Sequence, residues 1–248
     1  MDHEDNLGVP FPGVALPRAR WTQTGVARLP LNAHFDWAEL FARTGPVALD
    51  LGCGNGRSTI GLAVAHPQTG YLGCDVLPVV IRHAIRRANH RGLINVRFAV
   101  APALEVLQRL VRPASVTEIH LYHPQPYADL AEWHRRLITP EFLTLAWQAL
   151  SDGGQLFLQT DNTGYWDYLR AAMPIFFAFA ERADVWPDAP MGRTRREILA
   201  RARGLPIYRG IGVKRADLNL QEAIQRAEQL AAPVFDSRGR RSPRDGGS

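Results

Sequence analysis

The sequence has few cysteines and no long apolar run. Cysteine occurs only at Cys53 and Cys74, which lack the spacing of a metal site. No apolar run reaches the roughly 18 residues that a membrane-spanning helix needs, and residues 1–6 are too acidic and polar for a secretory signal. We therefore expect two reduced thiols in a cytoplasmic protein, with no metal and no membrane span.

Lysine is also nearly absent. Lys214 is the only lysine, although lysine and arginine together number 29 and the formal net charge is +5. Arginine suits planar contacts to phosphate, so the charge is compatible with an anionic partner but does not identify one. An arginine bias over a whole chain can equally follow from genome composition. The length of 248 residues, with 46% hydrophobic residues, is enough for one α/β domain with a full core.

The chain does contain a glycine-rich turn directly after an apolar run. The run Val47–Leu49 ends in Asp50, and glycine follows at Gly52, Gly54 and Gly56. Such a turn is typical of the ligand-binding edge of a parallel sheet. In dinucleotide-binding proteins the third glycine comes one residue later, and the Asp50 carboxylate would repel a phosphate. The segment instead resembles the first motif of class I S-adenosylmethionine (SAM) methyltransferases; a glycine turn without a ligand is the alternative.

A second acid supports the cofactor interpretation. The apolar run 70–74 ends in Asp75, about 20 residues after the glycine turn. An acid at the end of the second strand is placed to accept hydrogen bonds from ribose hydroxyls. Asp75 can alternatively cap the helix that we expect to follow it.

From residue 46 the pattern alternates between strands and helices, which predicts a parallel sheet with helices on both faces. The strands are expected at 46–51, 70–75, 95–100, 117–122 and 154–160, with a further strand within 176–185 and an edge strand at 207–214. The helices are expected at 57–66, 78–91, 102–111, 140–150, 163–172, 195–203 and 219–230, after a short one that Asn32 could cap. We predict a flexible N-terminal extension (1–30), a catalytic domain (31–232) and a disordered basic tail (233–248).

Several further motifs, taken in order, resemble those of the tRNA (guanine-N7)-methyltransferases. Besides the glycine turn they comprise Trp37–Phe41, Leu72–Asp75, Gly92–Arg97, Ala103–Leu107, Arg135–Leu143, Gln159–Asp161 and Thr194–Glu197. The resemblance covers about Asp36 to Arg215. The glycine motif is shared by many methyltransferases, whereas the later elements in this order are much more specific.

The resemblance implies a role for individual residues. It implies that SAM is bound by Asp50, Gly52, Gly54, Gly56 and Asp75. It also implies that the target guanine is bound by Asp161, Thr194 and Glu197. A carboxylate can accept both hydrogen bonds from the N1–H and amino edge of guanine, which adenine does not offer. Thr194 to Glu197 can alternatively be a capping box that opens a helix.

The chain departs from the family pattern at three positions. Gln125 stands where the family has the acid of a Pro-Asp-Pro-Trp-like loop, Asp129 aligns with a lysine, and Pro102 aligns with an acid near the adenine. Gln125 is therefore the candidate catalytic residue in place of a carboxylate. If the acceptor were an amine or a hydroxyl, His123 could serve as a general base. Trp133 to Arg136 could stack on bases and contact phosphate, or could form a helix face packed on the sheet.

We therefore expect an α/β fold, a doubly wound and mostly parallel seven-stranded sheet of the class I SAM methyltransferase (Rossmann-like) type. The expected activity is SAM-dependent methyl transfer to N7 of a guanine in tRNA, by a monomer or a homodimer. The alternatives are a SAM methyltransferase with another acceptor and a catalytically reduced RNA-binding paralogue.

Overall fold

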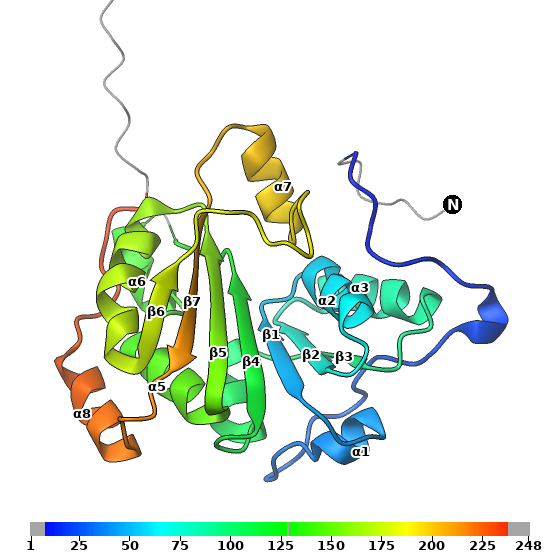
Figure 1. The fold of residues 1–248 in the computed structure, drawn as a ribbon, viewed down its shortest axis with the longest axis horizontal. Helices are drawn as coiled ribbons and strands as arrows, with labels where there is room; N and C mark the ends of the chain where they lie inside the picture. The colour runs from blue at the N-terminus through cyan, green and yellow to red at the C-terminus, as the bar shows by residue number, and fades with distance from the viewer. Residues whose placement is uncertain (1–7, 128, 238–248) are drawn as a thin grey trace, which may run out of the picture.

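The computed structural model describes residues 8–127 and 129–237, which contain a seven-stranded sheet (Figure 1). The strands are β1 (Val47–Leu51), β2 (Gly70–Asp75), β3 (Val96–Val100), β4 (Val116–Tyr122), β5 (Leu150–Thr160), β6 (Phe177–Glu181) and β7 (Tyr208–Lys214). Their order in the sheet is β3-β2-β1-β4-β5-β7-β6. The first five pair in parallel, and β7 pairs antiparallel with both β5 and β6. The predicted α/β fold with a mostly parallel sheet is confirmed.

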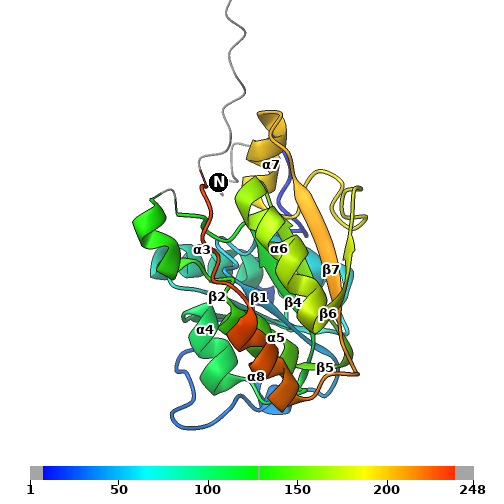
Figure 2. The same cartoon turned by 90° about the vertical axis from the view of Figure 1, so that its left-hand side faces the viewer.

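Helices cover both faces of the sheet. They are α1 (Trp37–Phe41), α2 (Arg57–Ala65), α3 (Pro78–His90), α4 (Ala103–Glu105), α5 (Pro140–Ala149), α6 (Thr163–Phe176), α7 (Arg195–Ala202) and α8 (Leu220–Gln229), with short turns η1 (Arg18–Arg20), η2 (Val106–Leu110) and η3 (Leu130–Arg135). One buried cluster joins α2 and α3 to one face of β1–β3, and a larger one joins η2, α5 and α6 to the other face of the sheet. Figure 2 shows α5, α6 and α8 lying together along the sheet. Among these described helices none is long and apolar enough to span a membrane.

The chain reverses direction across the sheet between β1 and β4. β2 and β3 lie on one side of β1, whereas β4 and β5 lie on the other. In an open parallel sheet this switch point leaves a crevice at the carboxyl ends of the strands, where ligands bind. Helix α7 stands over this region of the sheet (Figure 1).

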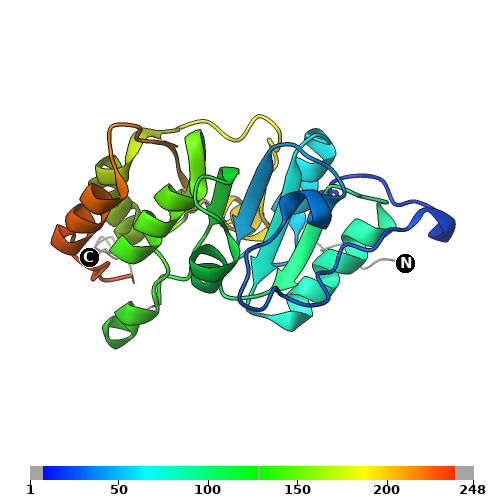
Figure 3. The same ribbon diagram turned by 90° about the horizontal axis from the view of Figure 1, so that it is seen from below.

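The N-terminal segment differs from the predicted flexible extension, because its described part packs along the domain (Figure 3). The Phe11 ring is buried against the guanidinium groups of Arg57, Arg87 and Arg91. Farther along, Thr24 accepts a backbone hydrogen bond from Phe98 on the edge strand β3. This pairing covers a strand edge that would otherwise be open, which gives the segment a fixed path.

Three other expectations need correction. Strand β7 was predicted at an edge but lies inside the sheet, and β6 is the edge strand. The inner position of β7 is tightly packed, since a Cβ at Gly210 would lie 2.5 Å from the Phe179 ring. The helix before β1 is capped by the Asp36 side chain, not by Asn32. Of the predicted disordered tail, residues 233–237 lie against the domain, and residues 238–248 lie outside the described part.

Candidate active site

Two adjoining cavities open at the carboxyl ends of β1, β2, β4 and β5. The first has a volume of about 420 Å³ and is bordered by the glycine turn, the start of α2, Asp161 and the start of α7. The second has a volume of about 330 Å³ and is bordered by Asp75, Pro102, Leu104 and Arg135. Gly52 and residues 122–125 line both. Each cavity has the size that small-molecule and cofactor sites have, and the shared residues make the two neighbours.

The glycine turn forms the shared floor. Gly52 and Gly54 have φ values of +79° and +53°, and a Cβ added to either would meet no atom within 4 Å. Both therefore border open space, which lets a ligand approach the main chain. Asp75 supports the turn, because one of its carboxylate oxygens accepts a hydrogen bond from Gly54 N at 3.1 Å and the other accepts from Leu77 N at 2.9 Å.

Two residues of the predicted cofactor site, Asp50 and Gly56, lie beneath this floor, and their role toward a cofactor stays a prediction. Asp50 is buried and accepts a hydrogen bond of 2.6 Å from the Thr59 hydroxyl. Burial raises the pKa of Asp50, against the lowering effect of that hydrogen bond. A Cβ at Gly56 would lie 2.8 Å from the Ala84 Cβ, so this glycine allows close packing of α2 on α3. Neither residue lines a cavity.

The loop after β4, residues 123–127, forms the wall between the two cavities. Its ends, His123 and Tyr127, have left-handed backbone angles with φ of +52° and +47°. Gln125 lies between two prolines, is exposed, and lines both cavities. The structure thus places the candidate catalytic residue at the border of both cavities.

The His123 ring is held between two side chains from the end of β5. Its Nε2 lies 2.9 Å from Gln159 Nε2, and its Nδ1 lies 3.0 Å from Asp161 Oδ1. The Gln159 oxygen already accepts hydrogen bonds from Trp186 and Arg209, so its amide nitrogen donates to His123 Nε2. The imidazole is therefore the neutral tautomer with its proton on Nδ1, which donates to Asp161.

This arrangement argues against His123 as a general base. A base needs a free ring nitrogen within hydrogen-bond reach of the substrate, whereas both nitrogens of His123 are occupied by protein groups. The ring is also nearly enclosed, with 5% of the side chain exposed. His123 therefore orients the loop that it begins.

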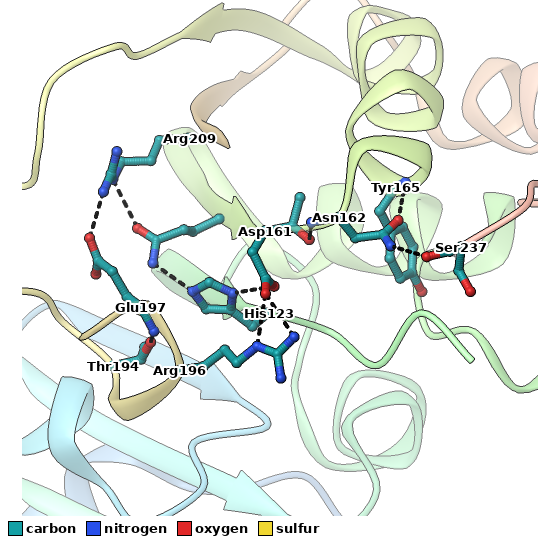
Figure 4. Close-up of polar contacts among 11 residues, drawn as sticks. His123, Asp161, Asn162, Tyr165, Thr194, Arg196, Glu197, Arg209 and Ser237 are labelled. Atoms are coloured by element: carbon teal, nitrogen blue, oxygen red, sulfur yellow. Dashed lines mark hydrogen bonds and ion pairs between the residues drawn. The ribbon is translucent and has the colours of Figure 1, made fainter. Parts of the chain in front are cut away.

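Asp161 connects this network to α7. Its Oδ1 accepts from His123, and its Oδ2 accepts from the Arg196 guanidinium at 2.7–2.9 Å (Figure 4). Burial alone would raise the pKa of Asp161, but the hydrogen bonds from His123 and Arg196 outweigh burial and hold the pKa well below its usual range. Asp161 is thus a carboxylate at neutral pH, and it lines the first cavity.

The other two predicted guanine ligands differ in position. Thr194 lines the first cavity and caps α7 by accepting a hydrogen bond from Glu197 N at 3.0 Å. Glu197 is fully buried and does not line the cavity. One of its oxygens accepts from Arg209 Nη2 at 2.6 Å and the other from Arg193 N at 2.8 Å (Figure 4). In this structure the Glu197 carboxylate fastens the start of α7 to β7, and its role as a guanine ligand stays a prediction.

The sequence analysis missed a second part of this polar network. The buried His120 ring contacts Glu118 and the Tyr122 hydroxyl, and Arg193 donates to that hydroxyl. The Arg193 guanidinium also lies 4.2 Å from the centre of the Trp186 ring. These residues come from β4 and from the segment before α7, and no spacing in the sequence could have brought them together.

The other two positions that depart from the family pattern lie at the edges of the site. Asp129 caps η3 by accepting a hydrogen bond from Ala131 N, and Pro102 lines the second cavity and precedes α4. Trp133 in η3 is 37% exposed, so it is not buried against the sheet as one alternative expected. The Arg135 guanidinium lies 4.6 Å from the centre of the Tyr127 ring at the rim of the second cavity.

Cys53 and Cys74 lie beside the glycine turn as free, buried thiols. Burial raises the pKa of both, that of Cys74 to about 12, so both stay protonated at neutral pH. Within residues 8–127 and 129–237 no group of three or more His, Cys, Asp or Glu side chains is arranged to hold a metal ion.

Residues 44–209 match a protein family that is described as putative methyltransferase. A tRNA (guanine-N(7)-)-methyltransferase from Halorhodospira halophila is 30% identical over 192 residues, which cover 76% of this chain and 83% of that protein. The chain belongs to the tRNA (guanine-N7)-methyltransferase family. Proteins of the same description from Streptomyces avermitilis and Alkalilimnicola ehrlichii are 36% and 32% identical over 58% and 60% of this chain, which spans 49% and 63% of their lengths.

Solved structures support the fold of this family member. The 16S rRNA methyltransferase KamB superposes with a TM-score of 0.54 at 16% identity, over 77% of this chain and 98% of that one. A second match is a mutant of the 16S rRNA (adenine(1408)-N(1))-methyltransferase from Catenulisporales acidiphilia, solved with cosubstrate SAM. It gives a TM-score of 0.50 at 15% identity, over 74% of this chain and 92% of that one. The chain therefore has the class I SAM methyltransferase fold.

Proposed function

We propose that this protein transfers a methyl group from SAM to N7 of a guanine in tRNA. The observation that carries the proposal is the pair of adjoining cavities, with Asp75 in one, Asp161 and Thr194 in the other, and Gln125 in the wall between them. The activity and the substrate follow the named relatives and are proposed on that basis. A cytoplasmic location is proposed together with the tRNA substrate.

The residues present fit SAM. Asp75 in the second cavity would accept hydrogen bonds from the ribose, and Pro102 and Leu104 offer an apolar wall for the adenine. In the first cavity the Ser58 hydroxyl is buried and has no hydrogen-bond partner among the described residues. Ser58 and the amide groups at the start of α2 would hold the amino-acid carboxylate, because a helix N-terminus attracts anions. When bound, SAM supplies an electrophilic methyl group on a sulfonium centre.

The chain's own residues would mainly position the acceptor. N7 of guanine has a free lone pair, so its methylation needs no base to remove a proton first. This agrees with a His123 ring whose nitrogens are both occupied. Alignment and exclusion of water can supply about 7–11 kcal/mol of the barrier. The Gln125 amide, at the junction of the cavities, can still donate and accept hydrogen bonds to the base or to the cofactor.

The guanine edge would meet Asp161 and Thr194. The Asp161 oxygens accept from His123 and Arg196, yet a carboxylate has about four acceptor sites and can accept further hydrogen bonds from guanine N1–H and the amino group. The Arg196 side chain is 62% exposed at the mouth of the first cavity, where it can meet a phosphate of the RNA.

The test is incubation of the full chain with methyl-labelled SAM and unmodified tRNA, followed by mapping of the labelled base. We expect label at N7 of a guanine, and none in a matched transcript made with 7-deazaguanine, which lacks that nitrogen. Label in the deaza transcript would place the methyl group on another atom. SAM binding without transfer to any tRNA would favour another acceptor, and RNA binding without SAM binding would favour a catalytically reduced paralogue. Light scattering would distinguish a monomer from a homodimer.

A further inference from the structure

Arg136 is a buried cation that is held by backbone carbonyls. Only 2% of the residue is exposed, and it forms no ion pair within residues 8–127 and 129–237. Its guanidinium instead donates hydrogen bonds to Pro126 O at 2.7 Å, Tyr127 O at 3.1 Å, Pro233 O at 2.6 Å and Phe235 O at 2.9 Å. A buried charge without hydrogen bonds is costly, so this arrangement is stable only while all the carbonyls stay in place.

These carbonyls belong to segments that are about a hundred residues apart in sequence. Pro126 and Tyr127 end the loop that carries Gln125, whereas Pro233 and Phe235 belong to residues 233–237, here called the C-terminal segment. The Phe235 ring lies 3.7 Å from the Arg136 guanidinium, measured to the ring centre. Arg136 therefore fastens the loop to the C-terminal segment.

The C-terminal segment is itself anchored to α6 and to the same loop. The Phe235 ring packs on Tyr165 with 5.1 Å between ring centres, and Gly164 leaves the space for it. Ser237 Oγ donates to Tyr127 O at 2.9 Å, and Asn162, next to Asp161, donates to Ser237 O at 3.0 Å (Figure 4). The segment thus joins the end of the Gln125 loop to the residue that follows Asp161.

We propose that Arg136 and the C-terminal segment position the Gln125 loop for methyl transfer; this inference rests on the proposed function. The Gln125 side chain has no hydrogen bond to another described residue, so its place between the cavities is set by the backbone of its loop. His123 holds the first end of that loop through Gln159 and Asp161. Arg136 and Ser237 hold the other end, where Tyr127 has a left-handed backbone.

The chain offers a closely matched pair of variants for the test. Ser237→Ala removes the hydroxyl that donates to Tyr127 O at 2.9 Å. Tyr168→Phe removes a hydroxyl that ties the nearby Ala231 carbonyl to α6 at 3.1 Å and does not touch the loop. Each change deletes one hydrogen bond to a carbonyl, but only the first one acts on the loop. Arg136→Lys is a stronger variant, because an ammonium group keeps the charge but loses the planar fork that reaches both segments.

Two measurements are made on each full-length variant. The first is kcat and KM for transfer to tRNA, with SAM affinity from calorimetry. We expect Ser237→Ala to lower kcat by about two- to tenfold, the range that one neutral hydrogen bond spans. The SAM affinity of Ser237→Ala should stay close to that of the wild type, and so should the kcat of Tyr168→Phe. The second is hydrogen exchange at the His123 amide, which begins the loop and donates to Gln159 O at 2.7 Å. This exchange should be faster in Ser237→Ala and in Arg136→Lys only.

The outcomes separate the two proposals. If the wild type transfers no methyl group to tRNA, the proposed function fails, and hydrogen exchange still tests whether the loop is held by Arg136 and Ser237. Equal exchange and equal kcat in Ser237→Ala and Tyr168→Phe would overturn the positioning role. The positioning role would also be overturned if Arg136→Lys lost activity only in proportion to its loss of folded protein, while hydrogen exchange in the loop of the folded fraction stayed normal.

Discussion

Replacement of Glu197 distinguishes a structural carboxylate from one that binds the base. In the structure Glu197 is fully buried and accepts hydrogen bonds from Arg209 and from Arg193 N. Glu197→Ala leaves the Arg209 guanidinium, itself 5% exposed, buried without its partner. Removal of one partner of a buried pair costs about 3–5 kcal/mol, which lowers Tm by about 6–20 °C in a protein of this size.

Glu197→Gln is the more informative variant. The amide oxygen can still accept one hydrogen bond, but its nitrogen meets a second donor where the carboxylate had an acceptor. We expect a loss of about 1–3 kcal/mol in the free energy of unfolding. The transfer rate per folded molecule should change little, because the side chain does not line the cavity.

The assay is thermal unfolding by circular dichroism together with methyl transfer per folded molecule. Glu105→Gln is the control, since it breaks the exposed Glu105–Arg109 pair, and such pairs contribute about 0.3–0.5 kcal/mol. An unchanged Tm in Glu197→Gln, with transfer to tRNA reduced about 10- to 100-fold, equivalent to about 1.4–2.7 kcal/mol, would refute the structural role. That result would instead support Glu197 as a residue that binds the guanine base.

Three further results are expected. Asp75→Ala should weaken SAM binding in calorimetry by about 10- to 100-fold, because it removes a charged hydrogen-bond acceptor. Asp75→Asn should weaken SAM binding less. Equal SAM affinity in the wild type and both variants would mean that Asp75 only supports Gly54. The tRNA association constant should fall linearly with salt on logarithmic axes, because neutralised phosphates release counterions; a flat plot would speak for a small-molecule acceptor. The pKa of Asp161 is lowered in the folded state. The ionised carboxylate therefore stabilises the fold fully above the unfolded pKa of about 4, and this stabilisation is lost as the pH falls below that value. The Tm difference between wild type and Asp161→Asn should narrow below about pH 4, and a constant difference would contradict the contacts with His123 and Arg196.

The central part of the fold could be predicted from the sequence because its signals are local. Each of the strands β1 to β5 contains a short apolar run that is ended by a turn or by the start of a helix, as at Asp75. This pattern depends little on the rest of the chain. The place of β7 inside the sheet was not predicted, and Gly210 shows why the sequence alone could not give it. The position is a glycine because the Phe179 and Trp166 rings occupy the space where a side chain would lie. Only the assembled sheet shows that neighbour.

The candidate site could be predicted as far as it lies in single turns. The Gly52–Gly54 turn, Asp75 and the Gln125 loop each come directly after a strand, so the fold class alone brings them to one edge. Whether a side chain at that edge points into the cavity or into the protein could not be predicted. Asp50 and Glu197 are acids in plausible motifs, but Thr59 and Arg209 accommodate them inside the protein. The sequence does not contain that information, because each partner comes from another element.

The same limit applies to the N-terminal segment. Its prolines and its lack of periodic apolar residues predicted flexibility, yet Phe11 is buried among arginines from α2 and α3. A single aromatic ring is a weak signal in a sequence. It is sufficient in the structure because Arg57 and Arg91 also donate to the backbone carbonyls of Pro10 and Pro12.

Methyl transfer to N7 is a reaction in which a neutral residue at position 125 can be tolerated. The positive charge of the sulfonium centre passes to the purine, so the transition state carries the same net charge as the bound reactants. A carboxylate beside the transferred group would stabilise both, and uniform stabilisation of this kind strengthens binding without raising kcat. The loss of a charge at Gln125 should therefore weaken substrate binding more than it slows the chemical step. What the reaction requires of this position is a fixed geometry, which the contacts of His123 and Arg136 at the two ends of the loop supply.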